Sequence, residues 1–240
     1  MLPDVFTPDV LAALWRGTQL TLGLTAISAV LGLALGFVAA LGRMSRLPAL
    51  RLLAGIYIET FRGTPLLVQL YFLYFAVPQL IRLAIPGFEP LPPFQTGVLG
   101  LSLFAGAYAA EIIRGSLNAV PRGQLEAASA LGLRPADILA RVLVPQAARI
   151  AVPALGNQFI GLLKDSSLVS VITVTELLLT ARQITSVNYQ FAPMYAAVGL
   201  IYFLLSNASA RVFAALERRL NRPYLTSSAR ARPPRSPAGG

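Results

Sequence analysis

The segment QLTLGLTAISAVLGLALGFVAAL, residues 19–41, decides the fold class of this chain. It contains no charged residue, and Thr21, Thr25 and Ser28 are the polar side chains that interrupt it. A helix needs about 20 apolar residues to cross a bilayer core of about 30 Å. The segment therefore predicts a membrane-spanning helix, and it makes the chain an integral membrane protein.

Four further segments of similar character follow along the chain. We expect spans at about residues 57–81, 94–113, 150–172 and 192–213. The composition agrees, because 55% of the residues are hydrophobic and only 12% are charged, against about 25% charged in soluble domains. The sequence thus predicts an all-α integral membrane protein with about five transmembrane helices.

The basic residues predict how the chain is oriented in the membrane. Cytoplasmic loops are enriched in Lys and Arg, and 15 of the 20 basic residues lie in residues 42–51, 114–149 and 211–240. These segments become cytoplasmic if the N-terminus is outside and the C-terminus inside. Residues 1–16 are then a short external N-terminus, with no sign of a cleaved signal peptide. Residues 215–240 form a basic cytoplasmic tail, which we expect to be disordered from residue 226.

Several function classes are excluded by what the sequence lacks. It has no cysteine and no histidine, so disulfides, thiol nucleophiles and His-based metal sites are absent. The net charge of +10 does not point to nucleic acid, because the basic residues lie in the gaps between apolar runs. The chain has no phosphate-binding loop of the ATPase type. We therefore expect neither an enzyme nor a metal site.

Span one carries Gly32 and Gly36, a GxxxG spacing. Small residues four apart let helix backbones approach closely. We favour packing within the chain over a seam between two copies.

Charged pairs occur in the predicted second and third spans. Glu59 and Arg62 are three residues apart and share one helix face, as do Glu111 and Arg114. Ionisable groups in a membrane are expensive and usually face a cavity or a partner. For the first pair, a salt bridge that locks helices together and a gate or cavity wall both remain open.

A break in the helix follows the first charged pair. Gly63 and Pro65 disfavour a continuous helix, and Thr64 lies between them. We expect a kink or an interruption there, before Leu66 begins the most apolar part of the second predicted span.

The fourth predicted span contains four polar residues in a row, Lys164 to Ser167. Consecutive residues cover all sides of a helix, so these side chains do not all face lipid. Neutralisation between Lys164 and Asp165 is the simpler interpretation. We favour a lining of a solute pathway, because side chains at positions i and i+1 diverge on a helix and so do not neutralise each other locally. The residues that we expect along the substrate pathway or gate are Glu59, Arg62, Thr64, Pro65, Glu111, Lys164, Asp165, Ser166 and Ser167.

The loop between the third and fourth spans has the sequence QLEAASALGLRPADILARVLVPQ, residues 124–146. It predicts two short helical pieces. Small alanines leave the first piece a smooth face that can enter a groove, and Glu126 is placed to cap or pair there. Gly132 allows a turn with positive φ, and Pro135 starts the next piece. The predicted orientation places this loop in the cytoplasm.

Four blocks, residues 61–72, 107–133, 145–172 and the final span, together resemble the polar amino-acid permease family of ABC importers. The resemblance covers about residues 17–214. It implies the type I ABC importer permease fold, a MetI-like bundle with a cytoplasmic coupling helix. It assigns contact with the ATPase to the EAA loop, here Glu126, Ala127, Ala128, Gly132, Leu133 and Pro135.

The same resemblance implies partners and a location. These are a dimer of ATPase subunits that hold ATP and Mg²⁺, a second permease copy or paralogue, an external solute-binding protein and a polar amino acid. The chain itself is expected to bind no cofactor. The location is a bacterial cytoplasmic (inner) membrane, where the protein is multi-pass.

The expected function is that of a permease subunit in an ATP-driven uptake system for polar amino acids. The form KDSSLVSVI, residues 164–172, resembles the glutamine- and glutamate-type members of the family most, which implies a substrate of that type. The alternatives are a secondary amino-acid transporter driven by an ion gradient, with Glu59, Glu111 or Asp165 as the ion site, and a membrane scaffold. Association with an ATPase through residues 124–146 supports the importer, whereas gradient-driven uptake without ATP supports the secondary transporter.

Overall fold

The computed structural model describes residues 5–228, with side chains through residue 220, and its regular elements in that range are all helical. Five helical stretches are long and apolar enough to cross a membrane: Pro8–Met44, Leu66–Ala84, Pro93–Asn118, Pro135–Ile172 and Phe191–Leu220. The prediction of an all-α chain with five spans is confirmed. The last helix extends to Ser228, and residues 229–240 of the predicted tail lie outside the described residues, so the disorder expected from residue 226 stays a prediction.

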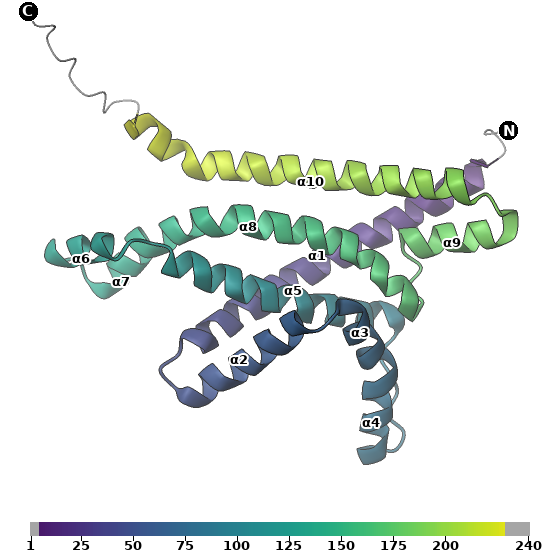
Figure 1. Ribbon diagram of the computed structural model, residues 1–240, viewed down its shortest axis with the longest axis horizontal. Coiled ribbons are helices and arrows are strands. Elements are labelled where there is room, and N and C mark those ends of the chain that lie inside the picture. The colour runs from purple at the N-terminus through teal and green to yellow at the C-terminus, as the bar shows by residue number, and fades with distance from the viewer. Residues whose placement is uncertain (1–4, 229–240) are drawn as a thin grey trace, which may run out of the picture.

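The first helix, α1 (Pro8–Met44), crosses behind the others in Figure 1 and packs along α5 (Pro93–Asn118). It starts within the predicted external segment, where the Thr7 hydroxyl accepts a hydrogen bond from the Val10 amide at 3.3 Å. A Cβ at Gly36 would lie 2.6 Å from the Ala109 Cβ on α5. The glycine spacing therefore serves packing within the chain, as predicted.

The three polar residues that interrupt the apolar run of α1, Thr21, Thr25 and Ser28, are buried inside the bundle. Thr21 and Thr25 each donate to the carbonyl four residues earlier, at 3.0 and 2.7 Å. Ser28 donates to the Val98 carbonyl of α5 at 3.4 Å. Each hydroxyl is thereby hydrogen-bonded inside the helix bundle, which removes most of the cost of burying it.

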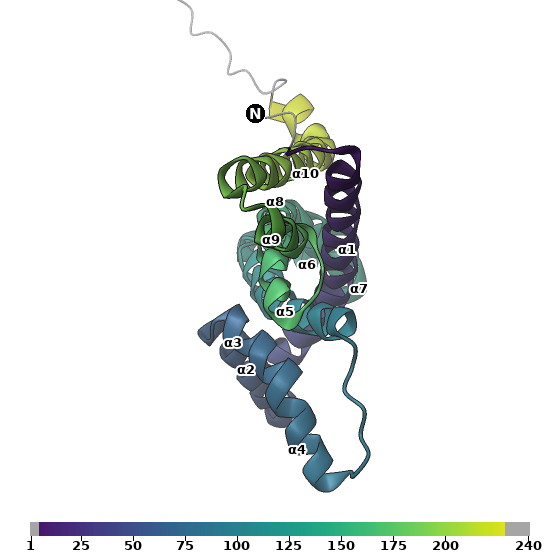
Figure 2. The ribbon, with the colours of Figure 1, turned by 90° about the vertical axis from the view of Figure 1, so that its right-hand side faces the viewer.

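The second predicted span is interrupted. A separate helix, α2 (Pro48–Gly63), ends where Thr64 turns to extended backbone, and α3 (Leu66–Tyr71) then begins after Pro65. A π-helical turn, η1 (Phe72–Ala76), leads into α4 (Val77–Ala84). The predicted boundary at residue 57 is thus wrong, because the spanning stretch begins at residue 66. In Figures 1 and 2 the α3–α4 arm projects away from α10.

The chain continues from α5 into α6 (Arg122–Ala130) and α7 (Pro135–Asp137), then through the π-helical turn η2 (Ile138–Leu143) into α8 (Val144–Asp165). A 3₁₀ segment, η3 (Ser166–Ile172), completes the fourth span. The chain then forms α9 (Leu177–Asn188) and α10 (Phe191–Ser228), which runs beside α8 (Figure 1).

Both π-helical turns come immediately before a Val-Pro pair. Val77 and Val144 donate their amides to residues five positions earlier, Phe72 and Leu139. The prolines that follow, at positions 78 and 145, lack an amide hydrogen and would crowd the preceding turn of a regular α-helix. A wider turn accommodates the proline without ending the helix.

Candidate functional site

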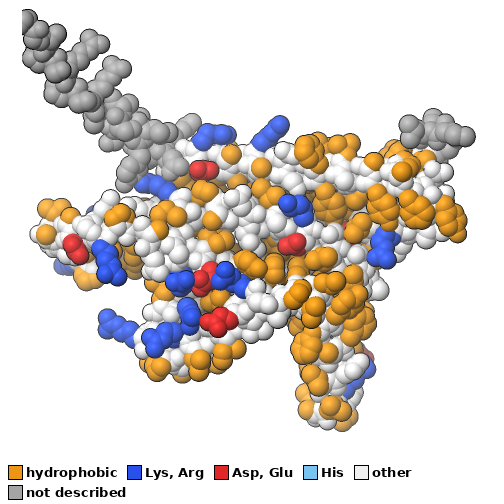
Figure 3. All heavy atoms as spheres, in the orientation of Figure 1, with side chains coloured by type: hydrophobic (Ala, Val, Ile, Leu, Met, Phe, Trp, Pro, Cys, Tyr) orange, Lys and Arg blue, Asp and Glu red, His pale blue; other side chains and the backbone are white. Residues whose placement is uncertain are grey.

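Two groups of residues concentrate the polar chemistry of the molecule. One is the bent loop around α6 and α7, at one end of the structure in Figure 1. The other is a set of charged side chains near α2 and the adjoining end of α5, where blue and red gather in Figure 3. Hydrophobic side chains cover much of the α3–α4 arm in the same view.

The loop bends where the sequence predicts. Helix α6 ends at Ala130, and Gly132 has a φ of +77°. That conformation favours glycine, because a side chain there would crowd the backbone. Pro135 then opens the next helix. Nε2 of Gln146, in the first turn of α8, donates to Oε1 of Gln124 at 2.6 Å and ties α6 to α8.

One face of the bent loop is exposed, small and apolar. Ala127 and Ala130 are exposed, and Leu131 beside them has 82% of its surface accessible. Ala128 is buried, so the three alanines do not form one smooth outer surface. Glu126 is exposed and forms no ion pair with any residue in the range 5–220. Leu131 is the residue of this face that sequence reasoning missed.

The charged cluster surrounds a pocket of about 310 Å³ lined by Arg43, Ile58, Glu59, Arg62, Glu111 and Arg114. Glu111 and Arg114, which share a helix face, pair in a bidentate contact of 3.0 and 2.6 Å. A salt bridge between Glu59 and Arg62, one of the two interpretations left open for these residues, does not form. Glu59 instead contacts Arg43 of α1 at 3.2 Å, and Arg62 lies 3.7 Å from Glu111. The turn between α1 and α2 brings Arg43 to Glu59.

Helix α2 is fixed against α5 by a tyrosine. The Tyr57 hydroxyl donates to the Leu103 carbonyl at 2.7 Å, and burial raises the pKa of Tyr57 to about 12. The hydroxyl therefore keeps its proton and remains a donor. This contact holds Arg62 near Glu111, and the Arg62 guanidinium also lies over the Tyr108 ring, 5.4 Å from its centroid.

Thr64 and Pro65, both predicted pathway residues, form the break between α2 and α3. Nε2 of Gln69 lies within hydrogen-bonding distance of the Phe61 carbonyl and of the Thr64 carbonyl and hydroxyl, at 2.9–3.0 Å. The Gln69 side chain thus stabilises the extended backbone at Thr64. Its Oε1 is buried and has no hydrogen-bond partner in the described part of the chain.

The polar stretch that begins at Lys164 lies where α8 gives way to η3. Ser166 is fully buried and donates to the Leu163 carbonyl at 2.6 Å, and Ser167 donates to the Lys164 carbonyl at 2.7 Å. Lys164 is exposed and Asp165 half-buried, and no ion pair joins them within residues 5–220. The two serine hydroxyls are thus held by the helix itself.

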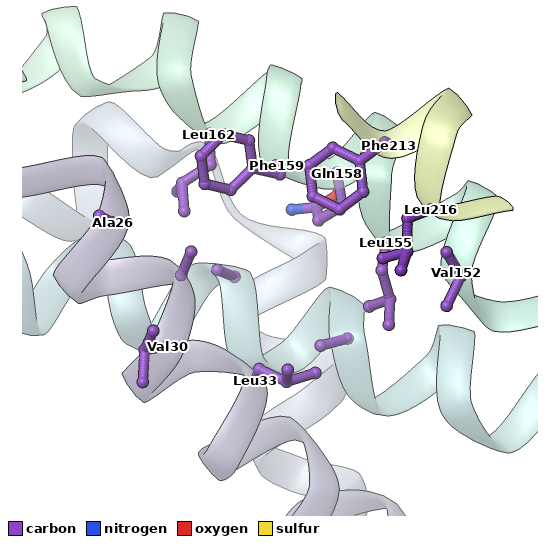
Figure 4. A pocket seen from close by; sticks show the side chains of 13 residues that line it. Ala26, Val30, Leu33, Val152, Leu155, Gln158, Phe159, Leu162, Phe213 and Leu216 are labelled. Carbon is purple, nitrogen blue, oxygen red and sulfur yellow. The ribbon is translucent and has the colours of Figure 1, made fainter. Parts of the chain in front are cut away.

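A second pocket, of about 400 Å³, lies between α1, α5, α8 and α10 (Figure 4). Phe159 and Phe213 approach each other at its wall, with ring centroids 5.5 Å apart. Gln158 is the single polar side chain among its thirteen lining residues. Such a lining suits hydrocarbon and is unsuited to a polar solute.

Glu176 is a buried carboxylate that sequence reasoning missed. Its oxygens accept the amides of Leu178 and Leu179, both at 2.8 Å, and so cap the first turn of α9. The signal was present as TVTELLL, residues 173–179, in which an acid precedes an apolar helical run.

The chain matches known proteins over most of its length. The model of the family "Binding-protein-dependent transport system inner membrane component" matches residues 32–222. The L-cystine transport system permease protein TcyB of Bacillus subtilis (strain 168) is 40% identical over 207 residues, which cover 86% of each chain. The arginine transport system permease protein ArtQ of the same organism is 37% identical over 205 residues, covering 85% of this chain and 91% of ArtQ.

A solved structure is similar in both fold and sequence. The crystal structure of an amino acid ABC transporter with histidines superposes with a TM-score of 0.79 and 38% identity, covering 89% of this chain and 100% of that one. The chain therefore belongs to the inner membrane components of binding-protein-dependent transport systems, as a multi-pass amino-acid ABC transporter permease of the type I importer fold.

Proposed function

We propose that this chain forms half of the translocation pathway of an ATP-driven uptake system for polar amino acids. Its loop at residues 124–146 docks into a groove of an ATPase subunit, which holds the ATP and Mg²⁺. The bend at Gly132 carries the proposal, because it presents Ala127, Ala130 and Leu131 on one exposed face. An exposed apolar face of this kind is suited to contact with a partner protein.

The orientation follows from the distribution of basic residues. With the N-terminus outside, the loop and the charged pocket both face the cytoplasm. A second permease copy or paralogue completes the pathway, and an external solute-binding protein delivers the amino acid. In this arrangement, Arg62 and Glu111 join the break after α2 to the end of α5 and form part of an inner gate.

The substrate is an amino acid with a polar side chain. The relatives are named for cystine and arginine, and all α-amino acids share an ammonium and a carboxylate group. The form of residues 164–172 favours a glutamine- or glutamate-type substrate. Lys164 and Asp165 offer charges of both signs at the end of α8 for the two charged groups of the solute.

Proteoliposomes that contain the permease, its ATPase and its binding protein test this function. We expect uptake of a radiolabelled amino acid that requires ATP and the binding protein and persists when ion gradients are collapsed. Competition with a panel of amino acids identifies the substrate. Uptake driven by a proton or sodium gradient without ATP would instead support the secondary transporter.

Substitution of Lys164 and Asp165 tests the substrate pathway. Asp165→Asn and Lys164→Met each remove one charge that we assign to the solute, so we expect the KM for uptake to rise about tenfold, the effect of losing about 1.4 kcal/mol of binding energy. Glu89→Gln removes an exposed charge outside the spans and serves as the control. Wild-type kinetics in both variants would remove these residues from the pathway.

A further inference from the structure

Glu176 is the only fully buried charged side chain among residues 5–220. It has no arginine or lysine partner in that part of the chain. A buried charge without compensation is costly. The groups around this carboxylate must therefore stabilise it by hydrogen bonds and by the dipole of the helix that it caps.

Three helices meet at this carboxylate. Besides the two amides of α9, Oε2 of Glu176 accepts the Tyr202 hydroxyl of α10 at 2.9 Å and lies 3.5 Å from the Thr21 hydroxyl of α1. The Thr21 oxygen in turn accepts the Leu177 amide at 3.2 Å. One acid thus joins α9 to two spans.

Packing between α1 and α9 is close at the same level. A Cβ at Gly17 would lie 2.9 Å from the Thr180 hydroxyl and 3.0 Å from the Leu177 Cα. Around this contact, Leu14, Ala181 and Met194 form an apolar cluster. The backbone of α9 therefore packs directly on α1. This close contact depends on the orientation of α9, which the Glu176 cap on its first turn helps to set.

We infer that Glu176 is a positioning residue, which keeps α9 docked on α1 and α10 so that the three helices move as one unit. The inference rests on the proposed function and orientation, which place α9 on the external side, between the fourth and fifth spans. A docked α9 keeps the outer end closed until the binding protein engages. Glu176 thereby determines how strictly ATP hydrolysis depends on that protein.

The conservative variant Glu176→Gln is informative because of its hydrogen-bonding groups. An ionised carboxylate only accepts, and all of the groups that face Glu176 are able to donate. The glutamine amide keeps the size of the side chain but turns one acceptor into a donor. It therefore places a donor against another donor while leaving the apolar packing unchanged.

The test uses the reconstituted transporter with its ATPase, and the readout is the ratio of ATP hydrolysis with the loaded binding protein to hydrolysis without it. We expect Glu176→Gln to lower this ratio about fivefold, at the lower end of typical coupling between sites, by raising the unstimulated rate. Tyr202→Phe should lower it less, and the double variant should add little to Glu176→Gln. Glu89→Gln, the same substitution at an exposed residue, should leave the ratio unchanged.

A purely structural role would lower both rates together and leave their ratio intact, which overturns the inference. Hydrogen exchange supplies an independent readout, since the amides of α9 should exchange faster in Glu176→Gln than in the wild type, while those of α5 do not. Should Glu176→Gln fail to insert, Tyr202→Phe carries the same two measurements, and unchanged values in it also overturn the inference. If the loaded binding protein does not stimulate ATP hydrolysis by the wild-type complex, the proposed function is refuted instead. In that case, hydrogen exchange in α9 still decides whether Glu176 holds that helix.

Discussion

Replacing Gly132 with valine is expected to lower ATP-driven uptake about tenfold, while the amount of inserted protein stays near that of the wild type. The φ of +77° at Gly132 is strongly disfavoured for a β-branched residue, and the strain costs on the order of 1–3 kcal/mol. The loop relieves that strain by changing its turn. A new turn moves α6, and with it the exposed face at Ala127 and Leu131, away from the position that the proposed contact with the ATPase requires. A factor of ten corresponds to about 1.4 kcal/mol.

Two controls separate the backbone from the side chain. Gly132→Asn has a side chain of similar size that tolerates positive φ, so it should retain most of the uptake. Gly123→Val introduces the same valine in α6, where a Cβ meets open space and φ is not positive, and it should also be active. Uptake and stimulated ATP hydrolysis in proteoliposomes provide the measurement. A fully coupled Gly132→Val transporter would show that the bend does not position the docking face.

Glu111→Gln is expected to be the most destabilising change in the charged pocket. The Glu111 carboxylate forms ion pairs with both Arg114, at 2.6 Å, and Arg62, at 3.7 Å, and only 21% of its side chain is exposed. Its neutralisation leaves two guanidinium groups without their partner. Removing one member of a buried pair costs about 3–5 kcal/mol, and the partial exposure here reduces our expectation to about 2 kcal/mol. Thermal unfolding in detergent micelles measures the loss.

The matched variant is Glu59→Gln, which breaks the ion pair with Arg43. The Glu59 side chain is 74% exposed, and exposed ion pairs contribute about 0–1 kcal/mol. We therefore expect a small change in its unfolding temperature. Equal losses in the two variants would mean that Glu111 does not link α2 to α5 through its arginines.

Local sequence signals predicted much of this architecture because they act within a few residues. The length of the apolar runs predicted five spans. Glycine and proline predicted both the break at Thr64 and the bend at Gly132, since each restricts or frees the backbone of its own position. The resemblance to amino-acid permeases named the family, which the comparisons confirm.

The same local signals could not predict contacts between residues that are far apart in the sequence. The spacing of Glu59 and Arg62 on one helix face suggested a salt bridge between them. The turn into α2 instead brings Arg43 to Glu59, and these two residues form the ion pair. The burial of Ala128 depends on how α6 folds back onto the following helical turn, which alanine content does not reveal. The sequence did not predict a role for Glu176, because its partners Thr21 and Tyr202 are more than 25 residues away along the chain.

The uninterrupted helical run from Pro135 to Ile172 has a mechanical consequence. At 1.5 Å per residue, the part between Pro135 and Asp165 is a rod of roughly 45 Å. One of its tips lies next to the bend at Gly132, and the other carries Lys164 and Asp165. Under the proposed function, this lever transmits a push from the ATPase end towards the solute end, and it can bend at two places, the wide turn before Pro145 and Pro153 inside α8.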